Sequence, residues 1–447
     1  MKRVTFAMGL VTALSTATPA LAAGPWSAPQ PFTGAALSGQ QLLALPGGGV
    51  AVSANTGLGL LTHPGANPTI VAPIGFTAVV SPAGVLGAPA ALGDGLAVNA
   101  LMPLADGRTA AIGTIGPNNH LVSAAGAAGE RFADLGALGV ARGFVVAARQ
   151  GAVLVRRCLG RFCARVDLVV VRRRGGRWAT PRAITRPGTA TGVRSGDVAK
   201  LPGGELAFAY EREHAIYERR LTPSGRLSPA QRVGAGVQSH PSIAPGGGHR
   251  VIVAWGWQRV SEGDALSPFA ARVACSSAIG HFGGHPRDLG SVPVTGTGRY
   301  VDGPGVVLRQ DDAGRSTLAW TGYQDGRFVV RTGPLSRTCA IAPQTIAVPG
   351  ADVVLGDLAV GPSGRATLAL VAGRRGADAP NGAPAESVFG LLAAQRADPA
   401  APFSGPALVS APGAFAVDPA VAIDRASGRS VLAWRDVSTG VQLSTAP

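Results

Sequence analysis

The sequence predicts an all-β protein of the β-propeller class, with eight four-stranded blades as the preferred count and seven as the alternative. Three observations predict this fold: a composition suited to short strands, a strand that recurs along the chain, and an offset between the two chain ends. The 447 residues include 64 Gly and 35 Pro. Gly and Pro favour turns and frequent Val favours strands, so the composition indicates short strands joined by turns.

The recurring strand is clearest in its last copy, GRSVLAW, which ends at Trp434. Each copy has a polar turn, then an apolar run with Ala next to last and usually a large residue last. Eight such anchor positions recur about every 54 residues, a period close to that of propeller blades. The anchors are Ala54, Gly113, Arg157, Tyr210, Trp255, Trp320, Leu370 and Trp434. Because the Trp residues repeat with a strand, we interpret them as core residues; a sugar-stacking platform is the alternative.

Each repeat has room for four strands. The anchor strand is the second; residues 419–423 exemplify the first and residues 327–331 the third. The fourth strand begins with a bulky residue, which two small residues and a proline follow, as in residues 178–181 and 403–406. Proline cannot donate to a strand ladder, so this strand is expected at the outer edge of a blade.

The two ends of the chain predict how the ring closes. After Trp434 there is room for one more strand, residues 441–447, so the last repeat lacks a fourth. Residues 26–29, WSAP, have the pattern of a fourth strand without a repeat before them. We therefore expect residues 26–32 to complete the last blade and remove its open edge.

Residues 1–22 have the pattern of a secretory signal peptide. Lys2 and Arg3 precede an apolar run, which leads to the cleavage signal Ala20-Leu21-Ala22. Residues 23–447 are then expected to form a single propeller domain that is secreted or otherwise extracytoplasmic, and monomeric. No later segment has the roughly 18 successive apolar residues of a membrane span.

Four cysteines in an oxidising compartment can pair in three ways. Cys158 and Cys163 enclose only LGRF, which favours a local bridge and leaves Cys275 to pair with Cys339. Free buried thiols are the alternative.

The segments GRSVLAW, STLAW and VIVAW resemble the repeats of secreted bacterial β-propeller proteins with sialidase-like blades, over nearly the whole chain. Sialidases carry an Asp-box, S-x-D-x-G-x-T-W, and a site with Tyr, Glu, Asp and three Arg. The nearest match, residues 312–320, has its Trp displaced, and no Arg triad can be placed. The last repeat also looks like the docking motif of quinone-dependent propeller dehydrogenases, but Trp434 lies two residues too far from Gly428.

Local catalytic motifs are missing from the sequence: it has no G-x-S-x-G elbow, C-x-x-C, H-E-x-x-H or Walker loop. His281 and His285 enclose two glycines, which favours a solvated loop over a zinc site. We therefore predict a non-catalytic propeller that binds a ligand or an envelope or polyanionic partner. The alternative is a glycan-acting hydrolase or lyase, whose site would need paired carboxylates contributed by several blades.

Six polar residues lie at or before the first strands of their repeats. First strands line the central channel, so these side chains would gather at one mouth and could hold Ca²⁺. The alternative is that each Asp accepts backbone N–H groups and shapes a turn. No other cofactor is expected. The six residues are Asp94, Asp197, His240, Asp302, Asp357 and Asp418.

The net charge of +15 is concentrated in one repeat: residues 142–186 hold twelve Arg and a single acid, Asp167. Guanidinium groups pair with phosphate, sulfate and carboxylate, so this repeat predicts binding to an acidic polymer or a cell-envelope component. A merely solvated face is the alternative. The candidate binding residues are Arg156, Arg157, Arg172, Arg173, Arg174 and Arg177.

Overall fold

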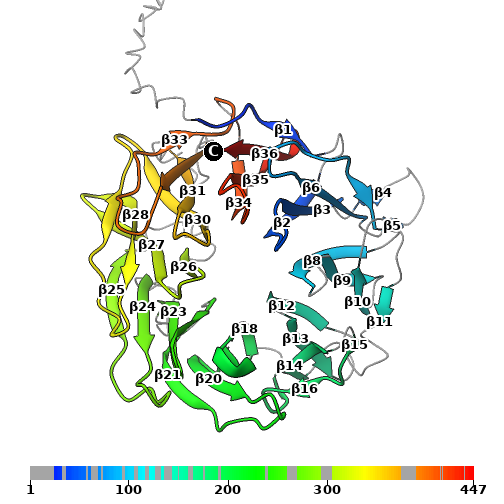
Figure 1. Ribbon diagram of the computed structural model, residues 1–447, viewed down its shortest axis with the longest axis vertical. Coiled ribbons are helices and arrows are strands. Elements are labelled where there is room, and N and C mark those ends of the chain that lie inside the picture. The colour runs from blue at the N-terminus through cyan, green and yellow to red at the C-terminus, as the bar shows by residue number, and fades with distance from the viewer. Residues whose placement is uncertain are drawn as a thin grey trace, which may run out of the picture.

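A computed structural model shows the described sheets arranged radially around one axis, which confirms the all-β propeller (Figure 1). No helix in the described part of the chain is long and apolar enough to cross a membrane. The structure describes residues 25–32, 37–56, 59–61, 69–71, 74–92, 96–104, 109–115, 120–125, 132–134, 143–149, 151–159, 165–174, 177–189, 193–236, 240–258, 269–292, 305–373, 389–412, 414, 416–436 and 438–447.

Seven of these sheets have four antiparallel strands, which lie in sequence order from the axis outwards except in the last one. The first two sheets consist of β2 (Leu37–Ala44), β3 (Val50–Thr56), β6 (Gly75–Val80) and β7 (Ala90–Ala91), and of β8 (Leu96–Pro103), β9 (Thr109–Ile115), β10 (His120–Ala125) and β11 (Phe132–Asp134). The next three consist of β18 (Val193–Lys200), β19 (Leu206–Arg212), β20 (Ala215–Leu221) and β21 (Gln231–Ala235), of β22 (Ser242–Gly247), β23 (Arg250–Gln258), β24 (Phe269–Cys275) and β25 (Arg287–Val292), and of β26 (Val306–Gln310), β27 (Ser316–Gln324), β28 (Arg327–Leu335) and β29 (Gln344–Ile346). The last two consist of β30 (Asp352–Val360), β31 (Ala366–Gly373), β32 (Phe389–Arg396) and β33 (Ala407–Leu408), and of β34 (Ala416–Ile423), β35 (Ser430–Asp436), β36 (Gly440–Ala446) and β1 (Gln30–Pro31).

The arginine-rich repeat forms a six-stranded sheet in the same ring, between the sheets of β8 and β18. It consists of β12 (Gly143–Arg149), β13 (Ala152–Leu159), β14 (Arg165–Arg174), β15 (Arg177–Trp178), β16 (Arg182–Ala183) and β17 (Gly188–Thr189). The last three all pair with β14, because Pro181 and Pro187 interrupt the segment along its outer edge. The preferred count of eight four-stranded blades is therefore not met: seven sheets are four-stranded, as in the alternative.

Among the described residues, a two-stranded sheet and a 3₁₀ turn lie outside the blades: β4 (Gly59–Leu61) pairs with β5 (Thr69–Val71), and the turn is η2 (Pro202–Gly204).

The anchor positions all lie in second strands, as the repeat predicts. Trp255, Trp320 and Trp434 are at most 2% exposed, which confirms core packing. The hydrophobic clusters mix side chains from neighbouring sheets, so each blade covers the apolar face of the next. One predicted fourth strand begins later in the sequence than expected. Phe403 was predicted to start this strand, but it precedes β33 and is buried.

The N-terminal segment closes the ring. Strand β1 pairs with β36, with Gln30 opposite Leu443, and the Phe32 N–H donates to the Val441 carbonyl at 2.9 Å. This confirms the prediction that residues 26–32 complete the last blade. The predicted signal peptide, residues 1–22, lies outside the described residues.

Candidate functional site

The inner strands are joined from blade to blade by two aspartates in equivalent places. Asp197 of β18 accepts the Val198 N–H at 2.8 Å and the N–H of Ile243, in the next inner strand, at 3.1 Å. Asp357 of β30 does the same with Leu358 at 2.8 Å and Val421 at 3.1 Å. Both carboxylates therefore act as the backbone-binding alternative predicts, each tying its strand to the next blade.

The other residues expected at the channel mouth do not share this arrangement. Asp418 lies at a register shift in β34, is exposed, and has its carboxylate 3.4 Å from the Arg435 guanidinium. His240 is exposed, and Asp94 and Asp302 lie outside the described residues. The part of the chain that the structure describes holds no group of three or more His, Cys, Asp or Glu suited to a metal ion. The Ca²⁺ site stays a prediction.

Two arginines that no sequence pattern singled out lie beside these aspartates. Arg149, the last residue of β12, places Nε 3.3 Å from an Asp197 oxygen. Arg309 of β26 donates from Nη2 to Asp357 at 3.2 Å and from Nη1 to the Leu308 carbonyl at 3.2 Å. The pKa of Arg309 is lowered because burial disfavours its charged form, an effect that Asp357 and Asp197 oppose and to which Arg149 adds.

The candidate arginines of the basic repeat fall into different environments. Arg157 forms a two-pronged ion pair with the buried Asp167, at 3.0 and 2.7 Å, and Arg172 donates to the Thr222 carbonyl of the next blade at 3.3 Å. Arg156 and Arg173 are half-buried, and Arg177 is the one exposed member of the group among those whose side chains the structure describes. The side chain of Arg174 lies outside the described residues. The predicted group is thus divided between structural and surface positions.

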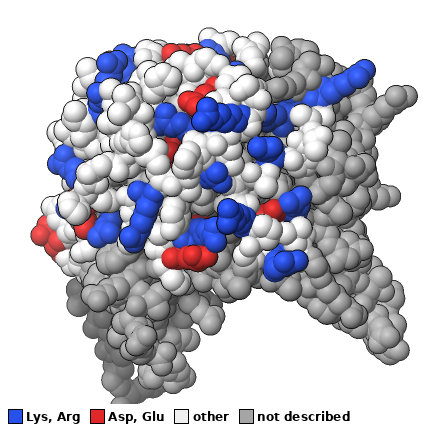
Figure 2. Space-filling view, turned by 90° about the horizontal axis from the view of Figure 1, so that it is seen from below, with Lys and Arg blue, Asp and Glu red and all other residues white. Residues whose placement is uncertain are grey.

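Six exposed arginines lie in β14, in the outer segments of the six-stranded sheet and in the outer part of the next blade, and we call them the basic rim. None of them forms an ion pair with an acid in the described part of the chain. Figure 2, seen from the side of β16, β20 and β21, shows many blue side chains and few red ones. The rim consists of Arg165, Arg177, Arg182, Arg186, Arg226 and Arg232.

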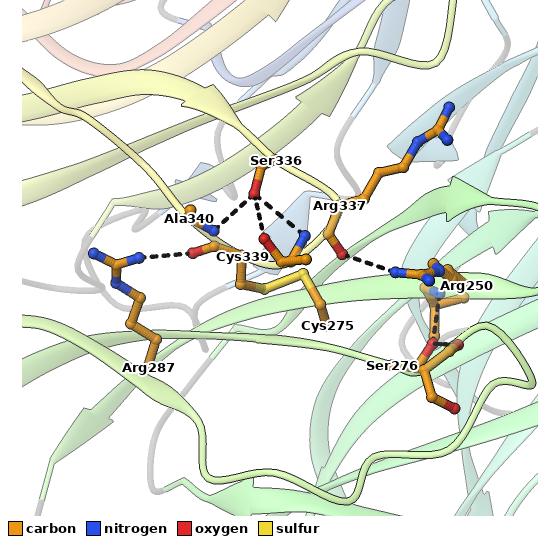
Figure 3. Close-up of a disulfide and its surroundings, with 11 residues drawn as sticks. Arg250, Cys275, Ser276, Arg287, Ser336, Arg337, Cys339 and Ala340 are labelled. Atoms are coloured by element: carbon orange, nitrogen blue, oxygen red, sulfur yellow. Dashed lines mark hydrogen bonds between the residues drawn. A yellow bond between two sulfur atoms is a disulfide. The ribbon is translucent and has the colours of Figure 1, made fainter.

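One disulfide joins two successive blades (Figure 3). Cys275 ends β24, Cys339 follows β28, and their pairing confirms the prediction. Arg287 donates to the Cys339 carbonyl at 3.2 Å, and Arg250 donates to the Arg337 carbonyl at 3.4 Å, so polar contacts flank the bridge. Cys158 is disulfide-bonded as well. Its predicted partner, Cys163, lies outside the described residues.

No family model and no curated protein matches this sequence. Solved structures are similar at low identity. An ulvan lyase has a TM-score of 0.46 at 12% identity and covers 76% of this chain and 92% of its own. The β-propeller domain of the Trilobed protease from Pyrococcus furiosus has a TM-score of 0.43 at 9% identity, covering 78% and 92%. An α-L-arabinofuranosidase from Fusarium graminearum has a TM-score of 0.40 at 10% identity, covering 94% and 98%.

Proposed function

We propose that this protein is a non-catalytic, extracytoplasmic propeller that binds an acidic polymer through the basic rim. The observation that carries the proposal is that the rim arginines are exposed and have no acid partner among the described residues. The signal-peptide pattern and the disulfide favour the extracytoplasmic location.

In contrast to the rim arginines, interior arginines of the same two sheets form ion pairs with buried acids. Arg157 is paired with Asp167, and Arg220 is paired with Glu218, which is fully buried, at 2.7 Å. Burial raises the pKa of Glu218 and Arg220 lowers it. These arginines neutralise buried acids, whereas the rim arginines keep their donors available to a partner.

The rim arginines lie on the outer parts of two neighbouring blades. Arg177 is in β15 and Arg182 in β16, both paired with β14, and Arg186 lies between β16 and β17. On the next blade Arg226 precedes β21 and Arg232 lies in it. Arg219 joins the two sheets by donating to the Ile184 carbonyl at 2.6 Å. When one polyanionic chain binds several exposed cations, several counterions are released, which makes binding strongly dependent on salt.

The glycan-acting alternative is less well supported by the described residues. General acid and base catalysis requires carboxyl groups that can exchange protons with a substrate. Asp197 and Asp357 instead bind two backbone N–H groups and one arginine each.

The test measures binding to immobilised heparin across a salt series. The double substitution Arg182→Ser with Arg186→Ser is expected to weaken binding and to reduce the slope of log K against log salt by about two. The matched control is Arg327→Ser with Arg337→Ser, which removes the same charge from exposed positions of another blade. Equal loss in both double variants would mean that net charge, not the rim, is responsible and would overturn the proposal.

A further inference from the structure

We propose that Glu218, Arg220 and Glu205 form a proton-binding site between two successive blades, so that this part of the ring contributes more stability in acid than at neutral pH. Glu218 and Arg220 lie in β20, and Glu205 directly precedes β19. Alternate residues of a strand share a face, so Glu218 and Arg220 point the same way as Ile216. Ile216 packs with the apolar side chains of β23, so this face of β20 lies against the next blade.

Glu218 has a carboxylate oxygen that no hydrogen bond satisfies. Its side chain is fully buried, and Oε1 accepts the Arg220 Nε–H at 2.7 Å. Oε2 is also buried and has no hydrogen-bond partner among the described residues. An ionised oxygen in such a place is costly, and a proton removes the charge without needing a cavity, as a water molecule or a metal ion would.

The charges of the three groups do not balance while both carboxyls are ionised. Arg220 places Nε 2.7 Å from Glu218 and Nη1 3.9 Å from Glu205. One positive and two negative charges leave the group with one excess negative charge, which a single proton cancels. The Glu205 side chain keeps 19% of its exposure, whereas Glu218 keeps none, so desolvation directs the proton to Glu218.

Arg220 also connects this group to the next blade. Arg220 and Gln231 both donate to the Gly280 carbonyl at 3.2 Å, and the Phe282 N–H donates to Gln231 Oε1 at 3.3 Å. His281, a titratable residue of this turn, is exposed. The protonation of Glu218 therefore acts on an arginine that holds the turn between β24 and β25.

The surroundings of Glu218 give the sign of the effect. Burial raises its pKa above 4.5, Arg220 opposes the rise, and the like charge of Glu205 adds to it. The residues opposite Glu218 in β19 and β21 are the uncharged Ala209 and Gln231. Because the folded pKa is higher than the unfolded one, the stabilisation is complete below 4.5 and is lost as pH rises through the folded value.

Infrared difference spectroscopy of the folded protein, titrated from neutral pH into acid, measures the proton directly. We expect a protonated-carboxyl band that appears with a midpoint above 4.5 and is missing from Glu218→Gln. If a water molecule satisfies Oε2 instead, Glu218 stays ionised down to its ordinary pKa. A spectrum without this band above 4.5 would therefore overturn the inference.

Urea unfolding of the same two proteins measures the consequence for stability. The free energy of unfolding of the wild type, minus that of Glu218→Gln, should rise as pH falls from neutral and become constant below 4.5. Groups that titrate elsewhere contribute equally to both proteins and cancel in this difference. A difference that is the same at every pH, or that falls in acid, would contradict the proposal.

Glu205→Gln tests the group of three and decides the matter if Glu218→Gln fails to fold. Removing this like charge should lower the midpoint of the carboxyl band, since Glu205 helps to raise the pKa of Glu218. Glu213→Gln is the matched control, because it removes a carboxylate of the same blade that is 64% exposed. It should leave the midpoint unchanged. Equal shifts in both variants, or no shift in Glu205→Gln, would count against the site.

Discussion

At the scale of single residues, the arginine in the recurring turn has a clear role. In three successive repeats it reaches the backbone of the next turn: Arg315 donates to the Ser363 carbonyl at 3.0 Å, Arg365 to Gly428 at 2.9 Å, and Arg429 to Pro82 at 3.3 Å. Arg429 thereby links the last blade to the first. The Gly-Arg pair that precedes these second strands is thus part of the contact between blades.

Asp424 stabilises the same turn, and its effect should depend on pH. It is 1% exposed and accepts the N–H groups of Gly49 at 2.7 Å, Ala426 at 3.1 Å and Ser427 at 3.2 Å. Burial alone would raise the pKa of Asp424, but hydrogen bonds from the Ser427 hydroxyl and these N–H groups outweigh it and lower the pKa.

We expect Asp424→Asn to reduce the free energy of unfolding at pH 7 by about 1–3 kcal/mol, because an amide cannot satisfy the same donors. The folded pKa of Asp424 is lower than the usual 3.8, so its contribution is complete above 3.8 and is lost as pH falls through the folded value. Urea unfolding should show the variant approaching the wild type in acid. Asp325→Asn, at an exposed hairpin position, is the control. A difference that does not shrink below pH 4 argues against this role.

At the scale of elements, strand β1 is short, but the residue that follows it carries a large side chain into the core. Phe32 is 2% exposed and packs among Val50 and Val52 of the first blade and Val441 of the last. The pairing of β1 with β36 sets the direction of the N-terminal segment, and the buried Phe32 ring contacts the first and the last blade.

Phe32→Ala is therefore expected to cost about 3–5 kcal/mol of stability, the usual effect of removing a buried aromatic ring. Gln30→Ala, in the adjoining strand β1 at an exposed position, should change stability little. Thermal and urea unfolding of both variants provide the measurement. Equal, small effects would show that the closure does not depend on this packing.

At the scale of the whole molecule, blades are held by contacts between neighbours, and one pair of neighbours is also joined covalently. Cys275 and Cys339 are separated by 64 residues and lie in successive sheets. Replacing both by Ser should lower the free energy of unfolding by about 2–5 kcal/mol, because the unfolded chain regains a long loop. Denaturant unfolding of the double variant under oxidising conditions tests this, since the bond at Cys158 then stays intact. Unchanged stability would refute it.

The features that the sequence predicted depend on residues close together along the chain, and the features that it missed depend on contacts between residues far apart in the sequence. The second strands and the closing segment were predictable because they depend on patterns within each repeat. The six-stranded sheet was not predicted, because its three short outer segments, which Pro181 and Pro187 separate, look like a single fourth strand in the sequence. The division of the arginines was missed too: Arg157 lies opposite the buried Asp167 of the neighbouring strand, whereas Arg177 lies exposed in the outer strand β15.

The sequence by itself determined the propeller class, the positions of the second strands and the closure by residues 26–32, since a repeated local pattern can bury its apolar face only against its own copies. It also predicted the pairing of Cys275 with Cys339, because Cys158 and Cys163 lie too close in sequence to favour other partners. Only the tertiary structure decided that Asp197 and Asp357 bind backbone, that Arg149 and Arg309 lie beside these aspartates, and which arginines remain on the rim. Those arrangements join residues from different blades, and no spacing along the chain records the distance between them.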